Sequence, residues 1–203
     1  MADKQRITGG NIIQSRAIKT REKLLKEALR IYAKNGYHDT TVDEIARNAG
    51  FSVGTAYRYF KDKKELLLAA LEYAFSHIEE LADISETDIS RADIEQALIS
   101  FEKIHMDYYD LHEELEGLRH TDEDVRRLYD HFTESALNDI YNKLPEEIRS
   151  RAHSLQDIRL AVGLMENHCH YCMHGNPDKE AIAYMRKKTI DLVRRIVNDF
   201  RMK

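Results

Sequence analysis

The scarcity of residues that end helices constrains the fold of this chain more than any other feature. Only two prolines and eight glycines occur in 203 residues, and the long stretches between them are rich in Leu, Ala, Glu, Lys and Arg. These residue types lose little side-chain freedom in a helix, whereas proline breaks a helix and glycine weakens it. The sequence therefore predicts an all-α protein, long enough to bury a hydrophobic core.

Capping and turn residues predict where the helices begin and end. About nine are expected, over residues 16–35, 41–49, 53–60, 62–81, 90–112, 113–118, 121–143, 154–174 and 178–201. The early short helices form an N-terminal three-helix module with a helix-turn-helix. The later, longer helices form a C-terminal bundle for ligand binding and dimerisation.

Charge divides the chain near residue 64. Residues 1–64 carry 14 Lys and Arg against 7 Asp and Glu, a net charge of +7, whereas residues 65–203 carry 17 against 29, a net charge of −12. A basic segment joined to an acidic one suggests a polyanion-binding module on a body with another task, although uneven surface charge is the simpler alternative. We expect two domains, 1–64 and 65–203, with residues 1–15 as a flexible arm.

The cysteines and the apolar runs bear on the cellular compartment. Cys169 and Cys172 are three residues apart in a charged region with no secretory leader before them, which argues against a disulfide framework. No apolar run approaches the roughly 18 residues that a membrane span needs. We therefore expect a cytoplasmic protein that has no membrane partner.

Two short helices around a glycine give the most specific pattern in the sequence. Thr41 and Glu44 form a capping box at the start of one helix, and Ser52 offers the N-cap of the next. Gly50 permits the sharp turn between them, and Ala56 is small enough for the two helices to cross closely. This arrangement predicts a helix-turn-helix.

Over about its first 70 residues the sequence resembles the TetR (tetracycline-repressor-like) family of bacterial regulators. The resemblance rests on ordered matches at Gly36, 40–46, 49–52, 55–60 and 63–66. It implies a recognition helix, Val53 to Tyr59, in the major groove of an operator DNA duplex, with flanking residues on the phosphates. The expected DNA-binding residues are Thr41, Ser52, Val53, Gly54, Thr55, Tyr57, Arg58, Tyr59 and Lys63.

Side-chain chemistry agrees with these roles. Hydroxyl groups and free amides at helix starts can hold phosphate oxygens, and so can the tyrosine hydroxyl groups. Val53 and Thr55 can touch thymine methyl groups, and Arg58 can pair with guanine or bind a phosphate. For Tyr57 and Tyr59, packing within the three-helix unit is the alternative.

The last two long helices carry apolar stripes with alternating spacings of three and four residues. Each also has a second apolar set, so each needs two packing partners, one of which can be another subunit. The second sets are Leu160, Leu164, His168 and Tyr171, and Val193, Val197 and Phe200. In the family that the chain resembles, these helices form a four-helix dimer interface, which suits a palindromic operator. We expect a homodimer whose interface contains Val162, Met165, Cys169, Cys172, Met185, Leu192 and Ile196.

The segment 168–174 also permits a metal-binding interpretation, because His168/Cys172 and His170/His174 are pairs on one helical face. Both cysteines continue the apolar stripe, however, and Cys-x-x-Cys within a helix lacks the loop geometry of zinc knuckles. We favour packing for the cysteines and surface positions for His170 and His174. We expect no bound metal and no cofactor, and metal binding stays open as the alternative.

Aromatic and titratable residues mix in the segment 102–120, as they do in many pocket linings. The resembled family keeps its effector pocket between the central helices, so we expect effector contacts from His105, Tyr108, Tyr109 and His112. Glu102 and His105 also spell Glu-x-x-His, an element of di-iron bundles, but such a site needs a second copy and two further glutamates. A helical metalloenzyme is therefore a remote alternative.

The expected function is that of a ligand-responsive, DNA-binding transcriptional regulator rather than an enzyme. A repressor that a small-molecule effector releases from a palindromic operator fits the pattern best. The alternative is a DNA-binding regulator that has a protein partner or no effector. The acidic body slightly favours a cationic or metal-chelated effector over an anionic one.

Overall fold

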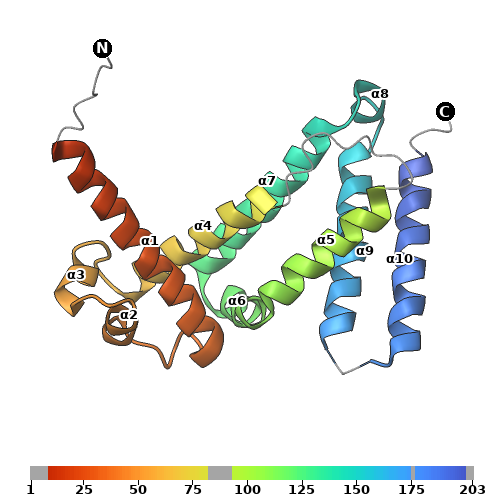
Figure 1. Cartoon of the computed structure of the whole chain (residues 1–203). Helices are drawn as coiled ribbons and strands as arrows, with labels where there is room; N and C mark the ends of the chain where they lie inside the picture. The colour runs from red at the N-terminus through yellow and green to blue at the C-terminus, as the bar shows by residue number, and fades with distance from the viewer. Residues whose placement is uncertain (1–8, 82–92, 175–176, 200–203) are drawn as a thin grey trace, which may run out of the picture.

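The computed structural model describes residues 9–81, 93–174 and 177–199 of the chain (Figure 1). Within these ranges it contains ten α-helices and no strand, so the all-α prediction is confirmed. The helices are α1 (Gly9–Asn35), α2 (Val42–Asn48), α3 (Val53–Tyr57), α4 (Lys63–Leu81), α5 (Asp93–Asp107), α6 (Tyr109–Thr121), α7 (Glu123–Lys143), α8 (Glu146–Arg149), α9 (Ser154–Met173) and α10 (Lys179–Asp199).

The helices form an elongated arrangement with different elements at its two ends (Figure 1). Helices α1, α2 and α3 lie at one end, and α9 and α10 lie side by side at the other. Between the two ends, α4 packs on α1 and α7, α6 packs on α1 and α7, and α7 packs on α9. The central helices therefore connect the helix-turn-helix to the C-terminal pair.

In the N-terminal module, two helix boundaries differ from the sequence-based expectation by three residues or more. Helix α1 begins at Gly9 rather than at residue 16, so the expected flexible arm, 1–15, is helical from Gly9 onward, while 1–8 lie outside the described residues. Helix α3 ends at Tyr57, although the amides of Tyr59 and Phe60 still bond the carbonyl of Ala56. The chain therefore continues in a single further turn.

The central helices divide at a different residue from the one expected. The sequence predicted a break after His112, whereas α5 ends at Asp107 and α6 begins at Tyr109, with no side-chain cap. No turn residue marks this junction, which is why the pattern missed it. The short helix α8 was also not predicted, and it follows Pro145, whose fixed φ suits a helix start.

Two glycines adopt the left-handed conformation that the turns of the N-terminal module require. Gly36 has φ +80° and ends α1, and Gly50 has φ +78° between α2 and α3. L-residues with a Cβ rarely adopt such values, so these positions favour glycine. Both turns were predicted from the sequence and are confirmed.

The predicted N-caps are present, although the capping box is only half formed. Thr41 accepts a hydrogen bond from the amide of Glu44 at 3.2 Å, and Ser52 accepts one from the amide of Thr55 at 3.2 Å. The Glu44 carboxylate accepts instead from the side-chain amide of Asn35, at 3.1 Å. Glu44 therefore ties α2 to the end of α1.

The main hydrophobic core runs through both parts of the chain. Its buried residues on α1 are Leu24, Leu25, Ala28, Ile31 and Tyr32, and the same cluster includes Leu111, Leu115, Leu118 and Val125 of α6 and α7. Complete burial of each leucine stabilises the fold by about 1.5–3 kcal/mol relative to exposure. A division near residue 64 stays a proposal, because the core continues across it.

Helix α6 also contacts the turn between α1 and α2 through a hydrogen bond. The backbone amide of Tyr37 donates to a carboxylate oxygen of Glu114 at 2.5 Å. A Cβ added at Gly36 would lie 3.5 Å from the other Glu114 oxygen, so α6 lies close to this turn. A charge-assisted bond of this kind is stronger than one between neutral groups.

Lys63, at the start of α4, holds the same turn from the other side. Its ammonium group donates to the carbonyl oxygens of Tyr37, His38 and Thr40 at 2.8, 3.1 and 2.8 Å, and lies 4.4 Å from the centre of the Tyr37 ring. Burial lowers the pKa of Lys63, while Asp39 acts in the opposite direction. Lys63 therefore has a structural role in this turn, and its expected contact with DNA phosphate stays a prediction.

Replacing Lys63 by methionine should lower the free energy of unfolding by about 1–3 kcal/mol, because three carbonyl oxygens lose their donor. Urea denaturation monitored by circular dichroism measures the effect. Lys61→Met is the matched control, since Lys61 is exposed, and it should change the free energy by less than about 0.5 kcal/mol. Equal stability of the two variants would contradict the structural role of Lys63.

Candidate functional site

The surface of α3 and the residues that follow it form the candidate DNA-binding face. Tyr57 is 51% exposed, Arg58 is also exposed, and Val53 and Thr55 are partly exposed. A Cβ at Gly54 would meet no atom within 4 Å, so the backbone is open to close approach there. The buried residue of α3 is Ala56, which faces the core as predicted.

The N-cap residues Thr41 and Ser52 border this face. Both side chains are exposed, and each hydroxyl oxygen accepts a bond from a backbone amide of its own helix. The oxygen of Ser52 also lies 2.9 Å from the hydroxyl of Thr55. Because capping uses the oxygen as an acceptor, the hydroxyl of Thr41 keeps its proton for a donor contact.

Tyr57 and Tyr59 have different environments despite their close spacing. Tyr59 is partly buried and packs against the main core, with its ring 6.4 Å from that of Phe60. Tyr57 is not part of this packing and projects into solvent. The structure therefore gives the packing role to Tyr59 and leaves Tyr57 available for a ligand.

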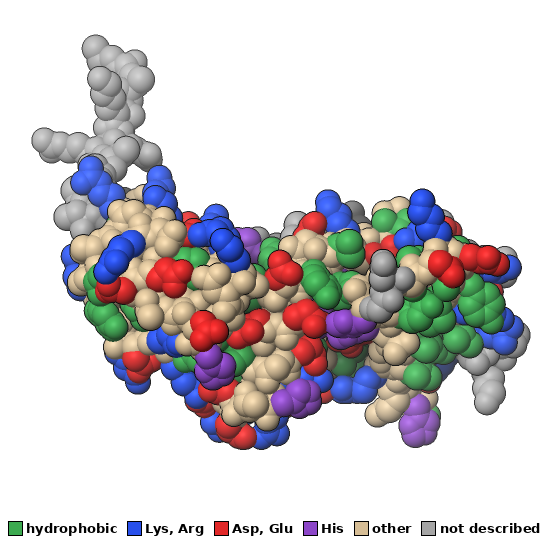
Figure 2. All heavy atoms as spheres, turned by 90° about the horizontal axis from the view of Figure 1, so that it is seen from below, with side chains coloured by type: hydrophobic (Ala, Val, Ile, Leu, Met, Phe, Trp, Pro, Cys, Tyr) green, Lys and Arg blue, Asp and Glu red, His purple; other side chains and the backbone are tan. Residues whose placement is uncertain are grey.

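Figure 2 shows Lys and Arg side chains, with some Asp and Glu among them, on the end of the molecule that carries α1. Arg16 and Lys19 are exposed on α1. Arg21 lies over the ring of Phe60 at 5.6 Å, and Lys23 lies over that of Phe51 at 5.4 Å. The helix-turn-helix core is therefore bordered by cations, as a polyanion-binding face requires.

The C-terminal helices bury one of the seven residues that were expected at a dimer interface and partly cover five others. Cys169 is 1% exposed, and Met165 and Val162 pack in two small clusters within the subunit. The reason is that α9 packs on α5, α7, α8 and α10, so this apolar stripe faces the subunit's own helices. Cys172, Met185 and Ile196 are partly buried, and Leu192 alone of the expected set is exposed, at 43%.

A different set of apolar side chains is exposed on α9 and α10. Leu160 is 56% exposed, Tyr171 37% and Tyr184 59%. Leu160 and Tyr171 belong to the second apolar set of α9 and lie about three turns apart, so they share a helix face. Figure 2 shows hydrophobic side chains gathered at the end of the molecule that α9 and α10 form.

One hollow of about 560 Å³ opens between α1, the junction of α5 with α6, and the end of α9. Its lining residues are Leu29, Arg30, Met106, Asp107, Tyr108, Tyr109, Asp110, Leu111, Cys172 and Met173. The lining includes the expected effector residues Tyr108 and Tyr109. It does not include His105 and His112, which lie in a separate cluster because the helix breaks at Tyr108.

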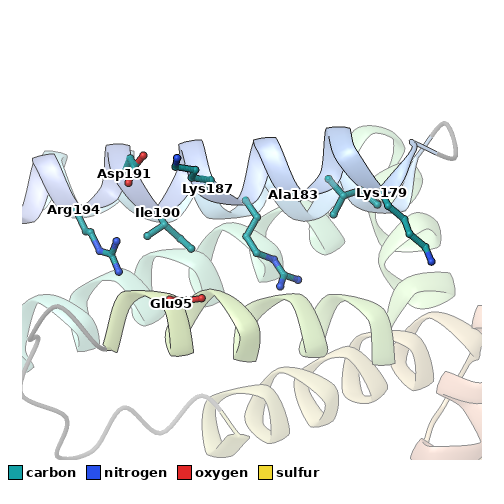
Figure 3. A pocket seen from close by; sticks show the side chains of 9 residues that line it. Glu95, Lys179, Ala183, Lys187, Ile190, Asp191 and Arg194 are labelled. Atoms are coloured by element: carbon teal, nitrogen blue, oxygen red, sulfur yellow. The ribbon is translucent and has the colours of Figure 1, made fainter.

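A second hollow of about 450 Å³ lies between α5 and α10 (Figure 3). Ile190 and Arg194 of α10 point toward α5, which carries Glu95. The remaining lining residues are Lys179, Ile182, Ala183, Arg186, Lys187 and Asp191. Four basic and two acidic residues line this hollow, so its lining carries a net positive charge.

Four histidines from three helices form a cluster beside the first hollow. The Nε2 atoms of His112 and His170 are 3.0 Å apart, and the His105 ring centre is 5.3 Å from that of His112 and 6.3 Å from that of His170. His174 stacks on His170 at 5.8 Å, and its Nε2 lies 3.2 Å from a carboxylate oxygen of Glu113. The expected surface position of His170 is wrong, because its ring lies against α6.

Burial favours the uncharged form of two members of this cluster, His105 and His112. Burial lowers the pKa of His112 to about 4, and the neighbouring His105 and His170 add to this shift. Burial also lowers the pKa of His105, against a hydrogen bond from the ring to the Phe101 carbonyl. These two imidazoles are therefore neutral at pH 7.

Glu102 joins α5, α9 and α10 through partly buried polar contacts. Its carboxylate accepts two hydrogen bonds from Arg186, at 3.0 and 2.5 Å, and lies 2.7 Å from Nε2 of the fully buried His168. His105 bonds the Phe101 carbonyl at 2.9 Å instead, so Glu102 and His105 do not act together as a di-iron element would. Burial raises the pKa of Cys169 to about 12, which suits a packed thiol.

Among the described residues, no group of three or more His, Cys, Asp and Glu side chains could hold a metal ion. In the same part of the chain, no helix is long and apolar enough to cross a membrane.

Comparison with known proteins identifies the N-terminal segment. The family of bacterial regulatory proteins called the tetR family matches residues 24–70. The transcriptional regulator BetI of Serratia proteamaculans is 37% identical over 83 residues, which are 39% of this chain and 42% of that protein. The regulator AcrR of Shigella flexneri is 40% identical over 65 residues, 32% of this chain and 30% of that protein. The chain thus spans less than half the length of these curated relatives.

Solved structures share the fold over most of the chain. A transcriptional regulator of Streptomyces coelicolor A3(2) has a TM-score of 0.70 at 18% identity and covers 88% of this chain and 98% of its own. A regulator of Saccharomonospora viridis, solved in complex with choline, has a TM-score of 0.65 at 18% identity and covers 87% of this chain and 96% of its own. The matching family and the named relatives are transcriptional regulators and not enzymes. Residues 24–70 therefore form a helix-turn-helix segment that matches the tetR family, and the chain as a whole shares its fold with solved transcriptional regulators.

Proposed function

We propose that the chain is a homodimeric repressor that binds a palindromic operator through α3 and leaves it when a small-molecule effector binds among the central helices. The exposed surface of α3, bordered by two N-capping hydroxyl groups, is the observation that carries the proposal. The alternative, a regulator with a protein partner or with no effector, shares the DNA-binding half of this proposal.

DNA binding is supported by the division of roles around α3. Thr41, Ser52, Tyr57 and Lys63 would position the helix on the phosphate backbone, with Lys63 acting through the turn that it holds. Val53, Gly54 and Thr55 present apolar and open surface to the major groove, and Arg58 is free to reach a base or a phosphate. Tyr59 would support this face from within the core.

Dimerisation is supported by the apolar face of α9 and α10. Leu160, Tyr171, Tyr184 and Leu192 expose between 37% and 59% of their surface in the single chain. Apolar side chains that cluster on one face indicate an interaction surface, and a two-fold dimer pairs one patch with its own copy. We therefore replace the buried and partly buried members of the expected interface with Leu160, Tyr171 and Tyr184, and we keep Leu192.

The hollow between α1, the α5–α6 junction and α9 is the proposed effector site. Tyr108 and Tyr109 supply aromatic surface, and Asp107 and Asp110 supply negative charge. This chemistry suits a small cation such as a quaternary ammonium compound, which aromatic rings attract through their electron-rich faces. The choline complex of the Saccharomonospora regulator is consistent with this ligand class.

The effector site also contacts the DNA-binding module. Leu29 and Arg30 of α1 line the hollow, and the adjoining helix α6 bonds the α1–α2 turn through Glu114. A ligand changes DNA affinity only if it binds two conformations unequally, with a typical coupling of about 1–3 kcal/mol. A ligand in this hollow would contact both α1 and the central helices, so its affinity would depend on how these helices are placed relative to each other.

Arg58→Met should weaken binding to a DNA duplex selected from a random library and lower the salt slope of log K by about 0.9 if Arg58 neutralises one phosphate. Tyr57→Phe should weaken binding by about 2- to 10-fold through loss of one hydrogen bond. Fluorescence anisotropy over a series of salt concentrations measures both. Lys103→Met, an exposed change on α5, is the control, and variants indistinguishable from it would refute the assignment.

Leu160→Asp or Leu192→Asp should convert dimers to monomers, because each places a carboxylate in the proposed apolar interface. Both positions are exposed in the single chain, so the variants should keep wild-type helix content. Sedimentation velocity measures the oligomeric state. Ile18→Asp, at a side chain 52% exposed on α1, should leave the dimer intact. Dimers of unchanged stability in the first two variants would exclude this face.

Choline should bind more tightly than its uncharged isostere 3,3-dimethylbutan-1-ol, and Tyr109→Ala should remove much of the difference, about 0.5–2 kcal/mol for a cation on an aromatic face. Isothermal titration calorimetry measures both ligands. His120→Ala, an exposed change on the same helix, serves as the control. Equal binding of both compounds, or no effect of Tyr109→Ala, would argue against a cationic effector.

A further inference from the structure

The histidine cluster contains a hydrogen bond that acid can break. His112 of α6 and His170 of α9 place their Nε2 atoms 3.0 Å apart, although the two residues are 58 positions apart in the chain. At this separation one nitrogen donates its proton, and the other accepts it through a lone pair. Two imidazolium rings would direct a proton at each other, so the bond does not form when both rings are charged.

The groups around this pair oppose a positive charge on it. The ring centre of His105 on α5 lies 5.3 Å from that of His112 and 6.3 Å from that of His170. His174 stacks on His170 at 5.8 Å, and Arg119 of α6 acts on His112 as a further cation. Helices α1 and α7 also pack on α6, but the charged groups that act on His112 come from α5, α6 and α9. A proton added to His112 would therefore meet three other imidazoles and one guanidinium group.

The nearby carboxylates of α6 contact other cations. A carboxylate oxygen of Glu113 lies 3.2 Å from Nε2 of His174, and both of these side chains are exposed. A carboxylate oxygen of Glu116 lies 3.1 Å from Nε of Arg119. Within the described ranges, the histidines that pair with a carboxylate are His168 and His174. A charge on His112 would therefore be buried without an acidic partner, which is costly.

Burial acts in the same direction as these neighbours. It lowers the pKa of His112 from 6.5 to about 4, and it lowers that of His105, on which Glu166 of α9 has a smaller opposite effect. An imidazole that leaves this environment regains its ordinary pKa and takes up a proton when the pH falls below that value. Acid therefore favours any state of the protein in which the cluster is open.

We propose that the contact of His112 with His170, together with His105, is an acid-sensitive joint between α5, α6 and α9, which is closed at neutral pH and opens when its rings take up protons. One added proton can still be shared between the two Nε2 atoms, because a charged ring can donate to a neutral one. Complete opening therefore requires charge on both rings.

Opening of this joint would reach the helix-turn-helix through α6. This helix carries His112 and, two residues later, Glu114, whose carboxylate accepts the hydrogen bond from the Tyr37 amide in the α1–α2 turn. A displacement of α6 from α9 would disturb that bond. The proposal does not depend on the proposed repressor function, because stability and amide exchange are measured without DNA or an effector.

Urea denaturation of the full-length protein at pH 7 and at pH 5 tests the proposal. The stability that depends on neutral His112 is fully present above the unfolded-state pKa of 6.5 and is lost as the pH falls toward about 4. Through His112 alone, the unfolding equilibrium constant should rise by about 20-fold between pH 7 and pH 5. The double change His112→Gln with His170→Gln should remove this factor from the wild-type rise.

His120→Gln on α6 and His131→Gln on α7 are the matched controls, because both histidines are exposed and lie outside the cluster. Each should keep the full wild-type rise, and the other titrating groups contribute equally to every variant. An NMR titration of the imidazole protons needs no variant, and in the wild-type protein it should show His105 and His112 titrating below the ordinary value. The proposal is overturned if every histidine titrates near pH 6.5 or if the double variant keeps the wild-type rise.

Amide hydrogen exchange of the peptide that contains Tyr37 tests the effect on the turn. Wild type and His112→Gln are compared at the same pH, so the intrinsic exchange rate cancels. At pH 5 the wild-type peptide should exchange faster than that of the variant, whereas at pH 7 the two should be alike. Equal exchange at both pH values would overturn the connection to the helix-turn-helix.

Discussion

Burial of one apolar stripe of α1 against two helices at once is the interaction on which the rest of this structure depends. Leu24, Leu25, Ala28 and Tyr32 lie in a core to which α4 and α6 both contribute. Because the same stripe serves the helix-turn-helix and the bundle, the position of α3 relative to α6 is fixed by packing and not by a linker. Glu114 and Lys63 then hold the α1–α2 turn from two directions. The candidate DNA-binding face is thus packed rigidly against the helices that would bind an effector.

Local signals in the sequence predicted the N-terminal module well. The conformations of Gly36 and Gly50 and the caps at Thr41 and Ser52 depend on residues within a few positions of one another, so their patterns are visible in the chain. The role of Lys63 was not visible in this way. Its three carbonyl partners are 23 to 26 residues away, and they converge only when α4 packs beside the turn.

Long-range arrangement was the part that the sequence predicted least well. Periodicity identified apolar stripes on α9 and α10, but a stripe that faces another helix of the same subunit has the same spacing as one that faces a second subunit. Burial of Cys169 and exposure of Leu160 support the proposed dimer face, which contains Leu160. The histidine cluster has the same origin, since its members come from three helices and no spacing in the chain brings them together.

The contacts of Glu102 determine how α10 is aligned with α5 and α9. Helix α10 packs on α9 and α5 through aliphatic side chains, and such contacts are not directional. Arg186 donates two hydrogen bonds to the carboxylate of Glu102, which also lies beside buried His168, and these bonds form at only one axial position of α10. If α10 shifted by one turn, the carboxylate would lose the partner of its charge. Glu102 therefore fixes the position of α10 along its helix axis. In a two-fold assembly built on α9 and α10, the axial position of α10 would set the distance between the two copies of α3. That distance would determine the spacing of the DNA half-sites that the protein can span.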